Sequence, residues 1–290
     1  MQYNRITRHF QNTLYVLLLV ATLASCNWAE EVIPIEEDFS NTNLTLGNPT
    51  EALPTYLDPD NFLIDLPQYT VSYSNARGIP NWVSWHLDDT WIGEAERAKY
   101  FNRNAELPTE WAPVTTNNYR NSGFDRGHNC PSADRTISED DNKSTFLMTN
   151  IIPQAPRHNQ RVWKSLEEYS RQLVEEGNEL YIVMGNYGQG GEGRNGFAET
   201  ISDGRITVPQ YIWKTIVVLP PGDDDVTRIA ADTRVITVLI ENINIDFEEW
   251  GKYRVSIDEI EDATGYDLLS RLPLAVQDVV EAVVDDGPTE

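Results

Sequence analysis

The stretch Asp125-Arg-Gly-His-Asn-Cys-Pro-Ser-Ala-Asp-Arg135 is the densest polar cluster in this chain of 290 residues. Its first four residues combine a carboxylate, a guanidinium, a glycine and an imidazole. The imidazole belongs to His128, one of only four histidines in the chain. An imidazole can accept a proton from water near neutral pH, so His128 is a candidate general base. The alternative is a structural histidine whose ring nitrogens are satisfied within the fold.

The segment from Asn159 to Gly177 is predicted to be a helix, because its apolar residues recur at helical spacing and Gly177 is a plausible stop. Residues four apart are offset by about 40° around an α-helix, so Asn159, Glu167 and Arg171 share a broad face. Asn159 offers an amide oxygen of the kind that a hydrated Mg²⁺ accepts. The alternative is a surface helix in which Glu167 and Arg171 form an ordinary i, i+4 ion pair.

The net charge of −24 argues, taken alone, against a polyanionic partner. The charge is unevenly distributed, however. Residues 97–171 carry 11 Lys and Arg against 9 Asp and Glu, so the acidity lies elsewhere in the chain. This near-neutral, arginine-bearing zone can still hold phosphate groups, although long-range attraction of a nucleic acid would be weak. The acidity of the remainder also keeps a protein soluble.

The first 26 residues are predicted to be an export signal. Arg5 and Arg8 form a short basic region, and the apolar run from Leu14 to Ala24 is too short to span a bilayer comfortably. The run ends in Leu23-Ala24-Ser25-Cys26, which resembles a bacterial lipobox. We therefore expect an exported lipoprotein with a lipid on Cys26, located in the periplasm or at the cell surface, or else a secreted protein. Ordinary signal cleavage is the alternative.

Charge and proline content divide the rest of the chain into three segments. Residues 27–64 contain no Lys or Arg and are predicted to be an acidic flexible tether. Residues 65–272 form the folded domain, and residues 273–290 are predicted to be a loosely attached acidic tail. Strands dominate the domain and helices punctuate them, which predicts an α+β fold with a central mixed, mostly antiparallel sheet flanked by helices. The expected strands are 68–73, 82–86, 114–116, 179–184, 205–208, 213–219 and 234–241, and a second helix is expected at 256–269.

Two patterns suggest other chemistry. Gly188–Gly193 fits the dinucleotide-binding pattern G-x-G-x-x-G, but no helix is expected after it, so no nucleotide cofactor is predicted. Cys130 and His128 could form a nucleophile pair, although no group that would orient the imidazole is evident. His158, next to Asn159, is expected to be an exposed neighbour rather than a metal ligand.

The chain resembles the sugar-non-specific DNA/RNA endonucleases of the ββα-metal superfamily, in particular their secreted cyanobacterial branch. The resemblance covers about residues 65–272, and the spacing from His128 to Asn150, Asn159, Glu167 and Arg171 is that of the family. The motifs that carry it are Asn81-Trp-Val-Ser-Trp85, Glu94-Ala-Glu-Arg97, Asp125-Arg-Gly-His128, Pro131-Ser-Ala-Asp-Arg135, Phe146-Leu-Met-Thr-Asn150, Pro153-Gln154, Asn159-x-x-x-Trp163-x-x-Leu166-Glu167-x-Tyr169, Arg171 and Thr264-Gly-Tyr-Asp267.

The resemblance implies a ββα-metal active site and a role for each matching residue. His128 is similar to the general base that activates the attacking water. Asn159 matches the one direct protein ligand of a hydrated Mg²⁺ or Mn²⁺ ion. Arg97 matches the arginine that offsets charge on the pentacoordinate phosphate. Glu167 matches the carboxylate that holds metal-bound waters, and Arg171 a second cation near the scissile phosphate.

Two further matches, Arg126 and Asn150, are implied to be supporting positions, and Cys130 departs from the family by standing where many relatives carry Ala. The implied substrates are DNA and RNA, contacted through sugar and phosphate without sequence specificity and cleaved to products with 5′-phosphates. A membrane, through a lipid on Cys26, and a protein inhibitor are further partners to be considered.

Two other classes of function compete with a metal-dependent endonuclease. The expected tether and lipobox also suit a nucleic-acid-binding or adhesive lipoprotein without catalysis, which would bind nucleic acid and not cleave it. A cysteine-dependent hydrolase using Cys130 is the other class, and it would be sensitive to thiol alkylation.

Overall fold

The computed structural model describes residues 42–290. The predicted export signal, including Cys26, and the first part of the predicted tether lie outside the described residues. Within the described range no helix has the length and apolar character needed to cross a membrane.

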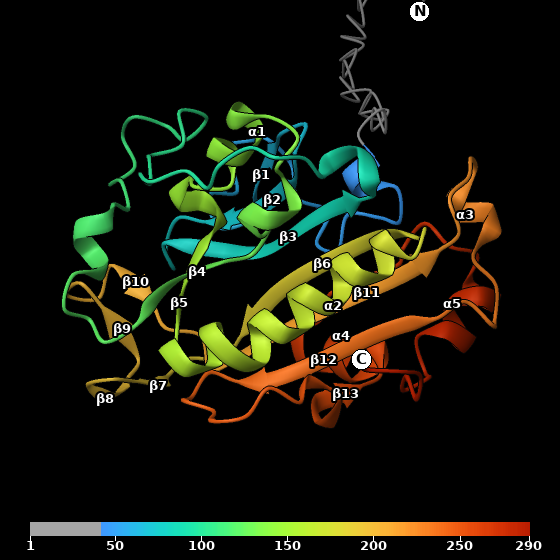
Figure 1. Cartoon of the computed structure of the whole chain (residues 1–290). Helices are drawn as coiled ribbons and strands as arrows, with labels where there is room; N and C mark the ends of the chain where they lie inside the picture. The colour runs from blue at the N-terminus through green and yellow to red at the C-terminus, as the bar shows by residue number, and fades with distance from the viewer. Residues whose placement is uncertain (1–41) are drawn as a thin grey trace, which may run out of the picture. The chain divides into compact units, whose positions relative to one another are not determined.

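The described chain is built on one seven-stranded sheet (Figure 1). All pairings between its strands are antiparallel, so the α+β prediction is confirmed and the sheet is antiparallel rather than mixed. Strands β3 and β6 are buried along almost their whole length, which requires cover on both faces of the sheet. In spatial order the strands are β1 (Phe62–Asp65), β2 (Thr70–Ser74), β3 (Ile79–Leu87), β6 (Glu179–Tyr187), β11 (Tyr211–Leu219), β12 (Val235–Glu241) and β13 (Arg254–Val255).

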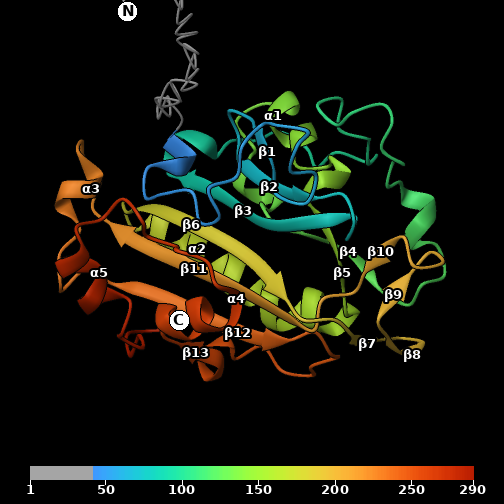
Figure 2. The same cartoon turned by 180° about the vertical axis from the view of Figure 1, so that it is seen from behind.

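Each face of the sheet has its own apolar core. Helix α2 (Lys164–Glu175) covers one face, where Leu166 and Leu173 join residues of the central strands. Helix α4 (Ile257–Thr264) covers the other, with Ile257 and Ile260 in a second core. Figure 1 shows α2 in front of the sheet, and the reverse view in Figure 2 brings α4 forward.

Shorter strands and helices surround the main sheet. Three pairs of strands lie outside the main sheet, and one helical segment, His158–Trp163, is a π-helix that runs directly into α2. The paired strands are β4 (Asp125–His128) with β5 (Ile151–Gln154), β7 (Gly191–Gly193) with β8 (Gly196–Ala198), and β9 (Thr200–Ile201) with β10 (Ile206–Thr207). The remaining helices are α1 (Glu139–Ser144), α3 (Asp225–Arg228) and α5 (Leu274–Val280), with 3₁₀ turns at Thr42–Leu44, Asp89–Trp91, Thr116–Tyr119, Ser132–Asp134, Met148–Asn150 and Trp250–Tyr253.

Most of the strands and both helices expected from the sequence are present, with ends shifted by a few residues. The expected strand at 114–116 is wrong, because Thr115 caps a 3₁₀ turn there through a capping box with Asn118. The expected helix at 256–269 ends earlier, at Gly265, whose φ of 73° is a left-handed conformation that stops an α-helix.

The predicted tether is wrong over its described part. Leu44, Leu46 and Ala52 are buried in the core beneath α4, and Asn43 donates to the carbonyl of Leu66. The sequence of this part is acidic, but its few apolar side chains are enough to pack it against the sheet. The boundary at residue 64 also cuts through strand β1.

The predicted loose tail is also wrong. Residues 274–280 form α5, and Val280 is buried in the core beneath α4. Further along, Asp285 is buried between Arg234 and Arg254, at 2.9 and 3.0 Å. Arg234, directly before β12, and Arg254, in β13, therefore hold in place a segment that its acidic composition predicts to be solvated.

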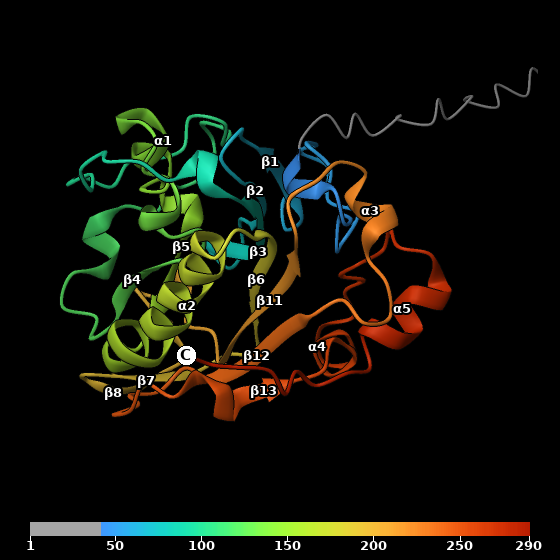
Figure 3. The same ribbon diagram turned by 45° about the vertical axis from the view of Figure 1, so that its right-hand side comes forward.

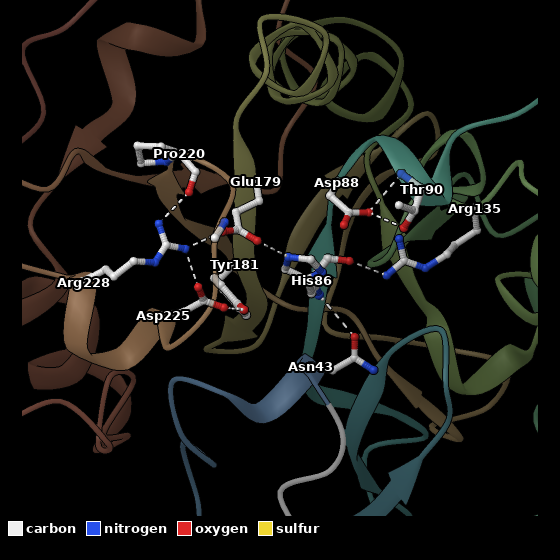
Figure 4. Close-up of polar contacts among 11 residues, drawn as sticks. Asn43, His86, Asp88, Thr90, Arg135, Glu179, Tyr181, Pro220, Asp225 and Arg228 are labelled. Carbon is white, nitrogen blue, oxygen red and sulfur yellow. Dashed lines mark hydrogen bonds and ion pairs between the residues drawn. The ribbon is translucent and has the colours of Figure 1, made fainter.

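A polar network ties α3 to the start of strand β6 (Figure 4). Glu179 accepts a hydrogen bond of 3.1 Å from His86 on β3 and one of 2.5 Å from Arg228 on α3. Arg228 also pairs with Asp225, which in turn accepts from the hydroxyl of Tyr181. The network closes one end of the central strands with paired charges.

Candidate active site

Strands β4 and β5 and the helix that follows form a ββα unit on one face of the sheet (Figure 1). The two strands pair in the register Asp125 opposite Gln154 and His128 opposite Ile151. The chain then enters the π-helix and α2, which carry Asn159, Glu167 and Arg171. Three stretches that are separate in the sequence thus meet in one place.

Gly127 permits this strand pair to close. A Cβ atom at position 127 would lie 2.2 Å from Oε1 and 2.7 Å from Cβ of Gln154. Gln154 is fully buried, and its amide donates a 2.7 Å hydrogen bond to Nδ1 of His158. The expectation that His158 is exposed is wrong: its ring is buried and stacks on Trp163.

His128 lies at the end of β4 against two aromatic rings. The ring centroids of Phe146 and Phe101 are 4.8 and 5.5 Å from that of the imidazole. Its Nε2 atom is buried and has no hydrogen-bond partner within residues 42–290. Burial, followed by the charges of Arg97 and Arg126, lowers the pKa of His128 to about 3, so the ring is neutral at physiological pH.

Arg97 and Arg126 pack against the same two phenylalanine rings as His128. The guanidinium of Arg97 lies 5.0 Å from the centroid of Phe146, and that of Arg126 lies 4.7 Å from Phe101. Arg97 also donates to the hydroxyl of Ser132, in the loop after β4. Neither arginine forms an ion pair with a carboxylate in the described part of the chain, so both charges are available to an anion beside His128.

Asn159 is oriented by the first residue of β4. Its side-chain amide nitrogen donates a 3.1 Å hydrogen bond to Oδ2 of Asp125. With the nitrogen so engaged, the carbonyl oxygen faces the other way and is left for another ligand. Asn159 lies in the π-helix, whose extra residue per turn changes its angular position relative to Glu167 from that in an unbroken α-helix.

Glu167 is half-buried and accepts no hydrogen bond from any described residue. Burial raises the pKa of its carboxyl to about 7, and the charges of Lys214, Arg171 and Arg97 oppose that shift. Lys214 is fully buried on β11, with its ammonium 5.3 Å from the ring of Trp85 and 4.9 Å from that of Trp163. A positive charge therefore lies behind Glu167, inside the protein.

Arg171 forms its ion pair with Asp134 at 2.9 Å, so the ordinary i, i+4 pair with Glu167 considered above is not what the structure contains. Asp134 is buried and also accepts from the indole nitrogen of Trp85 at 3.1 Å. Burial lowers the pKa of Arg171, but Asp134 and Glu167 more than offset that effect and raise it overall. The loop after β4 is thus joined to α2 by a charged pair.

Asn150 acts on the backbone of that loop rather than facing the site. Its side chain accepts from the amide of Cys130 and donates to the carbonyls of Cys130 and Thr145, each at 2.9 Å. Burial raises the pKa of the Cys130 thiol to about 12, so this side chain is not a thiolate at neutral pH. The Cys–His pair considered above therefore lacks its nucleophile.

The far end of the loop is fixed by Arg135. Its guanidinium donates to the carbonyl oxygens of Gln68 and His86, at 2.5 and 2.8 Å, and packs over the ring of Trp91. Figure 4 shows it reaching the β3 backbone from the side opposite Glu179. Arg135 is therefore a buried structural residue whose guanidinium donates to backbone carbonyls.

The structure adds residues that sequence reasoning did not assign. Asp125 orients Asn159, Asp134 pairs with Arg171, and Lys214 lies behind Glu167. Phe101 and Phe146 form the wall behind His128. Asp125 and Asp134 were visible in the opening stretch, whereas Lys214 comes from a strand far along the chain and no local pattern indicates it.

The donor set suits a hard divalent cation. One amide oxygen is left free by the bond to Asp125, and one half-buried carboxylate has no hydrogen bond within residues 42–290. Mg²⁺ and Mn²⁺ prefer oxygen ligands, and Mg²⁺ keeps most of its water, so two such groups are sufficient to position it. Asn159 would bind the ion and Glu167 would face its hydration shell.

Comparisons with known protein families, with individual proteins and with solved structures all find nucleases. A family model described as DNA/RNA non-specific endonuclease matches residues 47–275. A nuclease of Nostoc sp. is 43% identical over 276 residues, which cover 94% of this chain and 98% of the relative. The mitochondrial nuclease EXOG of Xenopus laevis is 27% identical over 205 residues, covering 68% of this chain and 55% of the relative. The solved EndoG/EndoGI complex matches with a TM-score of 0.65 and 19% identity, over 80% of this chain and 91% of the matched chain.

The antiparallel sheet carries a ββα unit with a neutral imidazole between two arginines, and the chain shares its fold with the EndoG structure. The chain belongs to the DNA/RNA non-specific endonuclease family. It is therefore a hydrolytic endonuclease that acts on nucleic acid, as the sequence predicted, and the non-catalytic lipoprotein and the cysteine hydrolase are set aside. The family depends on divalent metal ions.

Proposed function

We propose that this endonuclease hydrolyses DNA and RNA without regard to sequence, using Mg²⁺ or Mn²⁺, and leaves 5′-phosphates. The observation that carries the proposal is the buried Nε2 of His128, which has no hydrogen-bond partner among residues 42–290, beside two arginines that have no carboxylate partner in the same range. Phosphodiester cleavage needs a base for water and positive charge around the phosphate, and this arrangement offers both.

In the proposed reaction, Nε2 of His128 accepts a proton from a water molecule as its oxygen forms a bond to phosphorus. The bond from phosphorus to the 3′-oxygen breaks, and the phosphate stays on the 5′ side. Arg97 and Arg126 neutralise the phosphate oxygens while charge builds on them. Without substrate, burial and the charges of the two arginines hold the pKa of His128 at about 3; a bound phosphate anion would offset those charges and raise the pKa of the imidazole.

A divalent cation held by Asn159 would supply charge neutralisation at the phosphate and at the departing 3′-oxygen. The ionised carboxylate of Glu167 would accept hydrogen bonds from the water ligands of the ion, and the charges of Lys214 and Arg171 favour that ionised form. Asn150 and Asp134 position the loop and are not in contact with substrate. Backbone recognition of this kind reads sugar and phosphate rather than base edges, which accounts for tolerance of sequence.

The decisive test is cleavage of circular plasmid and of single-stranded RNA by the purified protein, with Mg²⁺ and with excess EDTA. His128→Ala should lower the rate by at least about 10²-fold, the contribution of a general base. Lys164→Ala is the control, since Lys164 is exposed on helix α2 and forms a surface ion pair with Glu168. Activity that persists in EDTA or in His128→Ala would overturn the mechanism.

We also propose that the protein is exported and carries a lipid on Cys26. The support is the basic, apolar and Leu-Ala-Ser-Cys order of its first 26 residues. Intact-mass measurement of protein from the membrane fraction tests this, with Cys26→Ser as the control. Protein of unmodified mass found only in the soluble fraction would refute the lipid anchor.

A further inference from the structure

A second group of acidic side chains lies on the face of the sheet opposite the active site. Asp258 and Glu261 are on α4, and Glu281 directly follows α5. Each contributes one carboxylate oxygen, and these oxygens all lie within 4.8 Å of one another. Figure 3 shows α4 and α5 as neighbours, and the amide of Asp258 donates to the carbonyl of Glu281 at 3.1 Å.

Glu281 is what distinguishes this group from an ordinary acidic surface. Its residue is only 6% exposed, and its Oε1 atom is buried without a hydrogen-bond partner in the described chain. None of the three carboxylates forms an ion pair there. A buried carboxylate is ordinarily paired or bound to a metal, because its desolvation is otherwise uncompensated.

The neighbouring acid Asp285 shows the usual solution. It lies four residues further along, is equally buried, and has two arginine partners that hold its pKa below the usual value despite burial. Glu281 faces Glu261, Asp267 and Asp258 instead, and burial together with these charges raises its pKa to about 7. Within the described residues, Asp285 therefore has positively charged partners and Glu281 has none.

We propose that Asp258, Glu261 and Glu281 bind a calcium ion that fastens the C-terminal segment to α4. Calcium accepts several carboxylate oxygens in flexible geometry and fills its remaining positions with water, whereas magnesium demands a near-ideal octahedron. Glu261 already accepts from the amide of Leu268 at 2.7 Å through Oε1, which fixes its side chain and leaves its second oxygen for the ion. The site bridges two helices, so its occupancy stabilises the fold rather than the reaction.

The experiment is thermal unfolding of the full chain at pH 8, in EDTA and with added CaCl₂ or MgCl₂, combined with calorimetric titration of CaCl₂. Glu281→Gln is the test variant, since the amide preserves shape and removes one ligand charge. Glu259→Gln is the matched control, an exposed acid on the same helix outside the group.

Wild type and Glu259→Gln should gain about 3–6 °C in Tm at a calcium concentration ten times the dissociation constant. Glu281→Gln should lose that gain and bind one calcium fewer, while its nuclease activity in magnesium stays unchanged. In EDTA it should melt no lower than wild type, because the substitution relieves repulsion.

Two results would overturn the proposal. One is a wild-type Tm that calcium leaves unchanged, which would mean that Glu281 is simply protonated. The other is an equal calcium response in wild type and Glu281→Gln, which would place the bound ion elsewhere, such as at Asn159. An equal gain with magnesium would reject calcium as the preferred ion.

Discussion

The side-chain amide of Asn159 donates to Asp125 across the junction between the π-helix and strand β4, at 3.1 Å. This bond decides which end of the amide faces the active site. Asp125→Ala should therefore leave the oxygen poorly oriented and raise the Mg²⁺ concentration needed for half-maximal activity by about 10- to 100-fold, as is typical for the loss of a partner behind a metal ligand.

The control for this prediction is Gln160→Ala. Gln160 donates to the same Asp125 oxygen at 2.7 Å but is exposed and holds no predicted ligand. Its removal should leave the magnesium requirement within about twofold of wild type. An equal requirement in Asp125→Ala and wild type would show that Asn159 is oriented by other means.

Gly127→Ala should destabilise the protein and reduce activity together. The new methyl group would meet the side chain of Gln154 at 2.2 Å, and Gln154 is buried with its amide engaged by His158. Overpacking of this kind costs about 1–3 kcal/mol. Urea unfolding measures that cost. Gly196→Ala is the comparison variant: a Cβ there meets nothing within 4 Å, but φ is 93°, so it reports the cost of backbone strain without a steric collision. An unchanged midpoint for Gly127→Ala would contradict the close packing.

The sequence predicted the sheet and the active-site helix because their apolar periodicity is local. The family motifs also predicted His128, Arg97 and Arg126 as site residues, and the structure brings these three around one pair of phenylalanines. What the structure shows about their chemistry, the neutral ring of His128 and the orientation of Asn159, depends on tertiary burial and hydrogen bonding.

The errors share one physical cause. Residues 42–64 and 273–290 were assigned from composition, yet a few apolar residues and the pair of arginines around Asp285 fix them in place. His158 was judged from its neighbour in sequence, whereas its burial follows from stacking on Trp163 within a π-helix that no local pattern distinguishes from an α-helix. Long-range contacts overrode local polarity in each case.

Glu167 should set the acidic limb of the pH–rate profile. In the substrate-free enzyme His128, with a pKa of about 3, is already neutral well below pH 6, so it does not limit kcat/KM there. The carboxyl of Glu167 has a pKa raised to about 7, and the ionised form is the one proposed to act, so activity should fall as pH drops through 7. Glu167→Gln should give a low, flat profile, and retention of the wild-type limb would assign it to another group.

The raised pKa of Glu167 should also make the stability of the protein depend on pH. A carboxyl whose pKa is raised on folding binds its proton more tightly in the folded state, so its stabilising contribution is full below about pH 4.5 and is lost as pH rises through 7. At pH 8 the ionised Glu167 therefore costs stability, and Glu167→Gln should unfold at higher urea concentration than wild type. At pH 4.5 the two midpoints should converge.

Lys214→Met should shift the acidic limb upward. The buried ammonium between Trp85 and Trp163 lowers the pKa of Glu167, so removing its charge raises that pKa above 7. If that pKa rises by about 1, the variant should be about fivefold slower than wild type at pH 7, because the ionised fraction of Glu167 falls from about one half to about one tenth, and it should recover toward the wild-type rate at pH 9. Methionine conserves most of the volume, but Glu167 and Asp134 lose a buried counter-charge, so the variant should be less stable than wild type at pH 9, where Glu167 is ionised.

The control is Lys164→Met, on the exposed face of α2, which should alter neither the pH–rate profile nor the stability. A loss of rate in Lys214→Met that is the same at pH 7 and pH 9 would show that Lys214 supports packing and not the charge of Glu167.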